Sequence, residues 1–293
     1  KYANWLFFFF ENFVILLFME ENVMKRILTI GGSDPFAGGG IQTDLKTFEN
    51  FGLFGLSALT SIGALDINER FMLESISLEL LKRQLVSIDK MTSLDGIKIG
   101  LLNSSEAIMV VRDFIKTKQN IPIILDPVLA FKETEAVINQ LYISQLIEEL
   151  FPLVTMITPN LAEAALLSGQ ALPSSLTEMI HLAKELTASG TKNIVIKGGT
   201  RMAGDEAVDL LYSIDHYEVF SHKKIDTTTV NGAGCAFSSA ITANLVLGAD
   251  FTKAVAESKK FVAHCISNGV LMNDHTGSVW SGGIQKGGMR NEN

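Results

Sequence analysis

The feature that most constrains the fold is a regular alternation of short apolar segments with longer amphipathic ones, from residue 26 to about residue 270. Segments such as RILTIGG (26–32) and NIVIKGG (193–199) are short and end in glycine, which is typical of buried strands. Segments with helical spacing, such as IQTDLKTFENFG (41–52), stand between them. Because strand–helix–strand units place successive strands parallel, we predict an α/β fold with a mainly parallel central sheet and helices on both faces.

The other expected elements follow the same order along the chain. Strands are expected at 56–65, 95–102, 121–128, 154–160, 207–213 and 217–221, the last two as a hairpin. Helices are expected at 77–89, 104–118, 134–151, 175–190, 234–248 and 253–270. Since no repeat, low-complexity linker or break in composition appears, residues 24–293 are expected to form a single domain.

The first 23 residues read differently from the rest. NWLFFFFENFVILLFM (4–19) is strongly apolar, but Glu11 and Asn12 interrupt it. A membrane-spanning helix needs about 20 apolar residues, and a secretory signal needs a basic start and a small-residue cleavage site. Met24 stands directly before the first expected strand. We therefore expect residues 1–23 to be an extension outside the fold, with no membrane association.

Composition excludes several classes of protein. A net charge of −8 argues against a nucleic-acid backbone as partner. The two cysteines, Cys235 and Cys265, make no disulfide framework and suit a reducing cytoplasm. The five histidines show no metal-ligand spacing, so a zinc site is not expected.

Ligands of parallel α/β sheets bind beyond the carboxyl ends of the strands. Glycines, prolines, carboxylates and a lysine follow the expected strands here, so these ends are predicted to form the site. The first strand runs into GGSDPFAGGGIQTD (31–44), which lacks the Lys-Ser/Thr of a phosphate-binding P-loop and a clean G-x-G-x-x-G. Taken alone, this segment reads equally well as a flexible turn.

The segment TVNGAGCAFSSAITANLVLG (229–248) places a cysteine at the start of an apolar helix, directly behind glycines. Gly232, Ala233 and Gly234 let backbone N–H groups converge, and the helix adds its positive end, so an anion hole is predicted. A thiol there is expected to have a lowered pKa, and Cys235 would accept a proton from a hydroxyl or orient it. The alternative is a small buried side chain, and that interpretation is preferred for Cys265.

Asn160 and Glu163 stand three residues apart at the start of an expected helix. They would either cap that helix or, together with Asp126, contribute to a magnesium–phosphate site, since Mg²⁺ prefers carboxylate and water oxygens.

Several motifs, in this order, resemble one family: TIGGSDPFAGGGIQTDLKTF, KIGLL, DPV, TPNLAEA, VIKGG and NGAGCAFSSAITANL. They are similar to hydroxymethylpyrimidine/phosphomethylpyrimidine kinases and to the closely similar bacterial pyridoxal kinases of the ribokinase-like superfamily. The resemblance covers about residues 26–270. It implies a ribokinase-like domain that uses ATP and Mg²⁺ to phosphorylate the CH₂OH of a small heteroaromatic alcohol, and a homodimer is expected.

The same resemblance suggests roles for individual residues. Cys235 would take the catalytic base position at the anion hole. The substrate pocket would be lined or supported by Asp34, Gly39, Asp44, Leu65 and Val128. Asn160, Lys197 and Asp209 would serve the nucleotide and its phosphates, and Asp126 and Glu163 would hold magnesium. Residues 128–136 would form a lid.

Three positions depart from the family pattern. Leu65 stands where pyrimidine kinases carry a glutamine, which favours pyridoxal, pyridoxine or pyridoxamine as substrate over hydroxymethylpyrimidine. Phe131 aligns with a lid cysteine that captures the aldehyde in some pyridoxal kinases, and Asn231 replaces a histidine before the Gly-Ala-Gly-Cys turn. A non-catalytic vitamin-binding relative or a nicotinamide oxidoreductase stays open as an alternative, although Asp126, Glu163, Lys197 and Cys235 argue against both.

Overall fold

The computed structural model describes residues 5–10, 13–18, 24–129, 140–214 and 216–282. Within these ranges one nine-stranded sheet has the order β11-β10-β9-β8-β7-β6-β3-β4-β5. The central strands β9-β8-β7-β6-β3-β4 pair parallel with one another. At the two sides of the sheet, β5, β10 and β11 pair antiparallel. The predicted α/β fold with a mainly parallel sheet is therefore confirmed. The strands are β3 (Arg26–Ser33), β4 (Phe54–Leu65), β5 (Phe71–Ser75), β6 (Gly96–Ile99), β7 (Ile123–Leu125), β8 (Met156–Ile157), β9 (Asn193–Lys197), β10 (Glu206–Ser213) and β11 (His216–Lys223).

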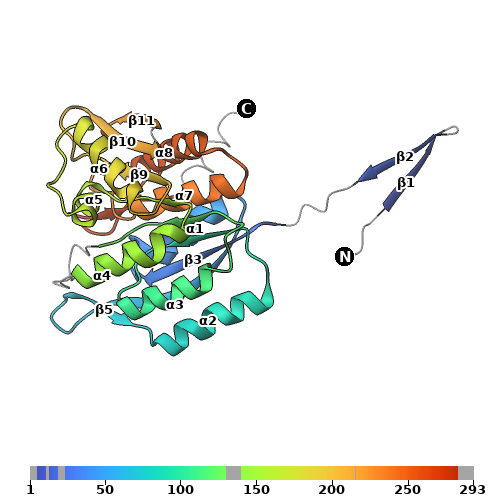
Figure 1. Cartoon of the computed structure of the whole chain (residues 1–293), viewed down its shortest axis with the longest axis horizontal. Coiled ribbons are helices and arrows are strands. Elements are labelled where there is room, and N and C mark those ends of the chain that lie inside the picture. Colours follow the sequence, from blue (N-terminus) through green and yellow to red (C-terminus); the bar gives the residue numbers. More distant parts are fainter. Residues whose placement is uncertain (1–4, 11–12, 19–23, 130–139, 215, 283–293) are drawn as a thin grey trace.

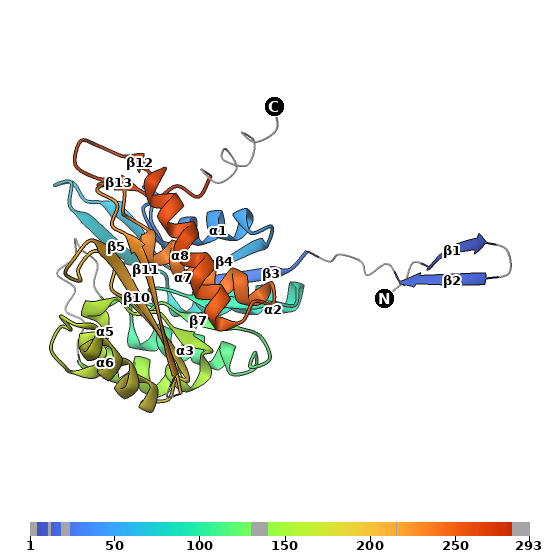
Figure 2. The same cartoon turned by 90° about the horizontal axis from the view of Figure 1, so that it is seen from above.

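Helices cover both faces of the sheet (Figures 1 and 2). One layer consists of α1 (Gly40–Asn50), α7 (Ala233–Val246) and α8 (Phe251–Ser267). The other consists of α2 (Leu78–Met91), α3 (Ser105–Ile115), α4 (Gln140–Gln145), α5 (Leu161–Ser168) and α6 (Leu176–Ala188). Because side chains alternate along a strand, Ile124 packs in the α7–α8 layer, whereas Ile123 and Leu125 pack in the other. The central strands are thus buried on both sides, which explains their continuous apolar runs.

Some elements differ from the sequence-based expectation. β5 was not expected; it closes one edge of the sheet by pairing antiparallel with the end of β4. Of the helix expected over 134–151, the described part starts as α4 (Gln140–Gln145) and continues as a π-helical turn (Leu146–Leu150) and a 3₁₀ turn (Phe151–Leu153). Pro152 in the last turn cannot donate a backbone hydrogen bond, which agrees with the end of the helical segment there. Residues 134–139 lie outside the described residues.

A short C-terminal hairpin, β12 (Val270–Leu271) and β13 (Gly277–Ser278), was also not expected. It is attached to the turn before α7, because the Asn231 N–H donates to the Gly277 carbonyl (3.1 Å) and the Val279 N–H donates to the Asn231 carbonyl (2.9 Å). The hairpin therefore fixes the backbone on which the predicted anion hole stands.

The N-terminal segment forms a separate antiparallel hairpin of β1 (Trp5–Phe10) and β2 (Phe13–Phe18). Figures 1 and 2 both draw it apart from the nine-stranded sheet.

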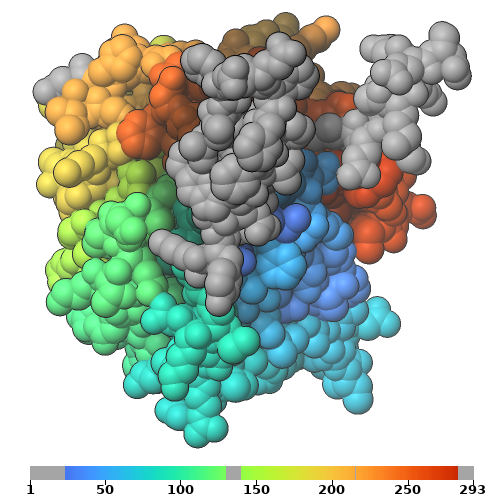
Figure 3. Space-filling model, turned by 90° about the vertical axis from the view of Figure 1, so that its right-hand side faces the viewer, coloured from blue at the N-terminus to red at the C-terminus, as the bar shows by residue number. Residues whose placement is uncertain are grey.

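In Figure 3, the blue surface of the first part of the main body lies between the turquoise surface near α2 and the red surface of the C-terminal part. Among the described residues, none of the helices combines the length and apolar character needed to cross a membrane.

A chain that starts at Met24 is expected to fold and to keep its activity. The main body makes its own first contacts immediately after that residue: the Lys25 ammonium donates to the Val246 carbonyl (2.6 Å), and the Arg26 N–H donates to the Asp95 carboxylate (2.8 Å). Thermal unfolding and turnover of the full and shortened chains measure the effect. A lower melting temperature or lost activity after truncation would show that residues 1–23 pack onto the main body.

Candidate functional site

The carboxyl ends of the parallel strands, here called the rim, bring several predicted residues together. Asp126 directly follows β7, and Lys197 is the last residue of β9. The Lys197 ammonium donates to Asp126 Oδ1 at 2.7 Å, and it lies 3.4 Å from the point that a Cβ on Gly234 would occupy. Three segments far apart in the sequence therefore meet at the first turn of α7.

The turn before α7 requires glycine. Gly232 precedes the helix with φ of 84°, in the left-handed region, and a Cβ there would lie 2.8 Å from the Gly38 carbonyl oxygen. The glycine-rich segment after β3 and the turn before α7 consequently pack backbone to backbone. Because the first N–H groups of a helix have no partner within it, this arrangement offers donors and a positive helix end for an anion.

Cys235 lies half-buried in the first turn of α7, with Sγ 3.9 Å from the position of a Cβ on Gly39. The prediction that its pKa is lowered is wrong. Burial raises the pKa of the Cys235 thiol to about 11, because desolvation of the thiolate outweighs the attraction of Lys98. The carboxylates of Asp44 and Asp126 add to the increase. At neutral pH the thiol is therefore protonated. Cys265, as expected, is a fully buried core residue.

Asp126 is held by three neighbouring side chains. It is 2% exposed, and besides Lys197 it accepts hydrogen bonds from the hydroxyls of Thr158 (3.3 Å) and Ser238 (3.1 Å). Burial alone would lower the pKa of Lys197, but the attraction of Asp126 and Glu163 raises it, so the ammonium stays charged. A fixed, charged lysine at an anion-binding helix end is suited to hold phosphate oxygens.

Asn160 and Glu163 do form a capping box. Asn160 Oδ1 accepts the N–H groups of Ala162 (2.9 Å) and Glu163 (3.0 Å), and Glu163 Oε2 accepts the Asn160 N–H at 2.7 Å. The structural alternative is thus observed, and these oxygens serve α5. Glu163 is also 6% exposed, and burial raises its pKa to about 7, with Asp126 adding to the increase and Lys197 opposing it.

The two carboxylates fit magnesium by their chemistry. Among the described residues there is no group of three or more histidine, cysteine, aspartate or glutamate side chains able to hold a metal ion. Mg²⁺ suits such a place nonetheless, because it commonly takes one or two carboxylates and completes its shell with water and substrate phosphates. Since the charge of Asp126 raises the pKa of buried Glu163, a divalent cation would relieve this repulsion. Asp126 and Glu163 therefore stay the predicted magnesium residues.

The pKa of Glu163 predicts a pH dependence of stability. Because the folded-state value is raised from 4.5 to about 7, its contribution is present below pH 4.5 and is lost as the pH rises through about 7. We expect the free energy of unfolding of Glu163→Gln to fall less than that of the wild type over this window. Urea unfolding at several pH values measures it; equal pH dependence in the two proteins would contradict the assignment.

Asp209 acts on the backbone rather than at the rim itself. It stands opposite Lys197 in the β9–β10 ladder, is 7% exposed, and accepts the Gly198 N–H (3.0 Å) and the Lys259 ammonium (2.7 Å). These contacts hold the turn that follows Lys197. The predicted nucleotide role of Asp209 therefore depends on the shape it gives to this turn.

The predicted substrate residues fall into two groups. Asp34 organises the glycine-rich segment, because its carboxylate accepts the N–H groups of Phe36 (2.9 Å) and Gly38 (3.0 Å). Gly39 precedes α1 and faces Cys235. Asp44, by contrast, is 1% exposed and paired with Lys98 at 2.9 Å, so its carboxylate lies beneath the surface and could only support a substrate site indirectly.

Leu65 and Val128 follow the strand order on opposite sides of β3, at the end of β4 and just after β7. Leu65 ends β4, is 50% exposed, and stands opposite Phe71 of β5. Val128 follows Asp126 closely, and its N–H donates to the Asp126 carbonyl (2.8 Å). Most of the predicted lid, including Phe131, lies outside the described residues.

Sequence reasoning missed the polar residues beneath the rim. Lys98, Thr29 and Ser239 are buried and bonded to Asp44, and Ser238 is bonded to Asp126. One signal was available for Lys98: it interrupts an otherwise apolar strand, GIKI, where a charged side chain needs a partner.

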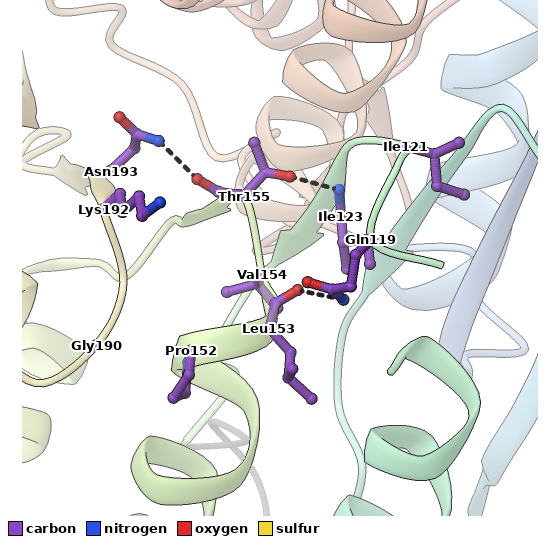
Figure 4. Close-up of a pocket in the computed structure, with 10 residues that line it drawn as sticks. All are labelled: Gln119, Ile121, Ile123, Pro152, Leu153, Val154, Thr155, Gly190, Lys192 and Asn193. Atoms are coloured by element: carbon purple, nitrogen blue, oxygen red, sulfur yellow. Dashed lines mark hydrogen bonds between the residues drawn. The ribbon is translucent and has the colours of Figure 1, made fainter. Parts of the chain in front are cut away.

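A hollow of about 210 Å³ lies at the other end of the sheet (Figure 4). It is at the amino ends of β7 and β9, where Ile123 and Asn193 begin these strands. Two of its polar groups bond within the hollow: the Asn193 amide donates to the Thr155 carbonyl (2.8 Å), and the Ile123 N–H donates to the Thr155 hydroxyl (3.0 Å). This hollow is separate from the rim. The charged residues and the helix end that suit phosphate binding are at the rim.

A mainly parallel sheet between two helix layers, with the site at its carboxyl edge, defines the chain as a ribokinase-like kinase. The model of the family described as phosphomethylpyrimidine kinase matches residues 34–280. The chain therefore belongs to the phosphomethylpyrimidine kinase family, as its motifs indicated.

Curated relatives support this assignment. Pyridoxine kinase of Bacillus subtilis is 38% identical over 256 residues, which cover 87% of this chain and 94% of the relative. Hydroxymethylpyrimidine/phosphomethylpyrimidine kinase of Rhizobium meliloti is 34% identical over 240 residues, covering 82% and 90%. Both substrate types are thus represented among similar proteins.

Solved structures show the same pattern. The ADP complex of Bacillus subtilis pyridoxal kinase has a TM-score of 0.84 at 36% identity and covers 89% of this chain and 99% of that one. Staphylococcus aureus pyridoxal kinase with AMP-PCP and pyridoxal has a TM-score of 0.84 at 32% identity, covering 90% and 96%. The phosphomethylpyrimidine kinase of Clostridium difficile has a TM-score of 0.71 at 32% identity, covering 83% and 99%.

Proposed function

We propose that the protein transfers the terminal phosphoryl group of ATP to the CH₂OH of pyridoxal, pyridoxine or pyridoxamine. The observation that carries this proposal is the position of Lys197, whose ammonium joins the Asp126 carboxylate to the anion-binding turn at Gly234. The relatives add the substrates: the similar proteins include pyridoxine and pyridoxal kinases, and solved ones were complexed with ADP, AMP-PCP and pyridoxal.

The residues then have distinct tasks. The substrate oxygen attacks the terminal phosphorus, the bond to the ADP oxygen breaks, and the hydroxyl proton leaves the substrate oxygen. Lys197 and the first turn of α7 neutralise the charge on the transferring group. Because the thiol is protonated at rest, Cys235 first orients the hydroxyl, and it accepts the proton only in its thiolate form. Magnesium, held by Asp126 and Glu163, would shield the phosphate charges.

Phosphorylation of hydroxymethylpyrimidine is the second candidate. It is favoured by the description of the matching family and by relatives such as the Rhizobium meliloti kinase. ATP consumption with pyridoxal, pyridoxine and hydroxymethylpyrimidine offered side by side separates the two. Of the three alcohols, we expect pyridoxal or pyridoxine to give the highest turnover. Binding without ATP consumption would instead point to a non-catalytic vitamin-binding protein.

Leu65→Gln is expected to shift the ratio of kcat/KM toward hydroxymethylpyrimidine. Leucine provides no hydrogen bond along the polar edge of an aminopyrimidine, and an unpaired buried polar group costs about 1–3 kcal/mol. Competition kinetics on wild type and variant measure the ratio, with Leu172→Gln as a control at a similarly exposed leucine. A wild type that prefers the pyrimidine by about tenfold, equal to about 1.4 kcal/mol, would overturn the substrate assignment and leave the kinase assignment standing.

We also propose a cytoplasmic homodimer. Both described cysteines are free, which suits a reducing compartment. Strands β4 and β5 expose the apolar side chains of Ile62 and Met72, which a second copy would cover. Light scattering coupled to size exclusion measures the oligomeric state, and a monomer at micromolar concentration would contradict the dimer.

A further inference from the structure

A second charged pair lies beneath the rim, separate from Lys197 and Asp126. The side chains of Lys98 on β6 and Asp44 on α1 are each 1% exposed and are 2.9 Å apart. Charges are rarely buried so completely unless they are paired, and the burial carries a substantial desolvation cost. Nothing in the proposed chemistry so far uses Lys98.

One carboxylate connects four elements at this point. Asp44 Oδ2 accepts the Thr29 hydroxyl of β3 (2.6 Å) in addition to Lys98, and Asp44 Oδ1 accepts the Ser239 hydroxyl of α7 (2.7 Å). All four side chains are buried. The network therefore ties α1 and α7 to the two central strands β3 and β6.

The contact between the helices is arranged in two layers one turn apart. Ser239 follows Cys235 by four residues on α7, and Asp44 follows Gly40 by four residues on α1. Residues four apart lie on the same face of a helix. The lower layer holds Asp44 and Ser239, and the upper layer holds the start of α1 against the Cys235 thiol, with Sγ 3.9 Å from the position of a Cβ on Gly39.

Four charged groups act on Cys235 from the elements around it. Lys98 of β6 and Lys197 of β9 attract a thiolate, whereas Asp44 of α1 and Asp126 after β7 repel it. Lys98 opposes the effect of burial more strongly than any other neighbour of the thiol. Burial alone would lower the pKa of Lys98, but the carboxylates of Asp44 and Asp126 raise it, so the ammonium stays charged.

We propose that Lys98 is a positioning residue for phosphoryl transfer: paired with Asp44, it holds the first turns of α1 and α7 in register, and its charge favours negative charge at Cys235. The catalytic part of this inference rests on the proposed function. The electrostatic part does not, because the reactivity of the thiol is measurable without turnover.

The experiment follows alkylation of Cys235 by iodoacetamide as a function of pH. All proteins carry Cys265→Ala, so that only Cys235 reports. Lys98→Met is expected to move the midpoint upward by about one pH unit, which makes alkylation about tenfold slower well below the midpoint. Asp44→Asn is expected to move the midpoint downward. Arg112→Met, which removes a cation paired with Glu149 away from the rim, is the control and should leave the midpoint unchanged.

Loss of Lys98 alone leaves a buried, unpaired carboxylate, which is strongly destabilising. The double variant Lys98→Met/Asp44→Asn avoids this, and its comparison with Asp44→Asn isolates the lysine charge. We expect the double variant to have the higher midpoint of the two. Equal midpoints, or single substitutions that shift the midpoint in the same direction, would overturn the proposal.

Turnover supplies the second readout. In the double variant kcat is expected to fall at least tenfold relative to the Cys265→Ala parent, with KM for the alcohol changed less than threefold. Unchanged kcat would overturn the positioning role even if the midpoint moves. If the parent consumes no ATP with any of the three alcohols, the proposed function fails, and the midpoints alone decide whether Lys98 controls the thiol.

Discussion

Replacement of Cys235 by alanine is expected to lower kcat by about 10²–10⁴-fold while ATP still binds, because general-base assistance is typically worth that much. The side chain stands in the first turn of α7, three residues after Gly232. A larger residue at Gly232 would place its Cβ 2.8 Å from the Gly38 carbonyl oxygen. The backbone donors of the turn remain in the variant, so a residual rate is expected. Steady-state kinetics and nucleotide titration measure the two effects.

Cys265→Ala is the matched control, since Cys265 is a core residue on α8 and not at the rim. It is expected to lower stability without a comparable effect on kcat. A kcat of Cys235→Ala near that of the wild type would remove the thiol from the mechanism. The backbone anion hole and Lys197 would then account for catalysis.

Lys197→Met is expected to lower kcat by about 10²–10³-fold, the range observed when one group that stabilises transition-state charge is removed. The substitution also leaves Asp126 without the cation that it contacts at 2.7 Å. Because Lys197 opposes the increase in the pKa of Glu163, that pKa should rise further. The pH profile of kcat and the magnesium dependence of turnover measure these effects.

Lys192→Met provides the comparison for Lys197, because Lys192 is exposed and immediately precedes β9 at the opposite end of the strand. Its loss should leave kcat within about twofold, since surface substitutions away from a site change little. Equal effects of the two substitutions would mean that Lys197 has no special position at the rim.

The approach of Asp126 to Lys197 was predictable from the sequence. Both residues follow apolar strands, and the carboxyl ends of parallel strands share one edge of a sheet. The start of α7 was also predictable, since Gly232 and Gly234 mark a turn and a long run of small and apolar residues follows. Local pattern and chain direction suffice for such inferences.

The pKa of Cys235 was not predictable in the same way. The sequence shows a helix start, which lowers the pKa of a thiol, but it does not show how completely the surrounding elements remove water or that Asp44 and Asp126 face the sulfur. Lys98 is a parallel case: its strand is evident, whereas its partner Asp44 lies 54 positions earlier on α1.

The sequence by itself determined the class of fold, the family, and which strand ends carry the polar residues of the rim. These depend on periodicity, chain direction and short motifs, which are local properties. Only the tertiary structure decided the edge strand β5, the Asp44 network and the protonation of Cys235. Each of these depends on long-range neighbours: an edge strand forms where a partner offers unpaired backbone, and a pKa follows the burial and charges supplied by four different elements.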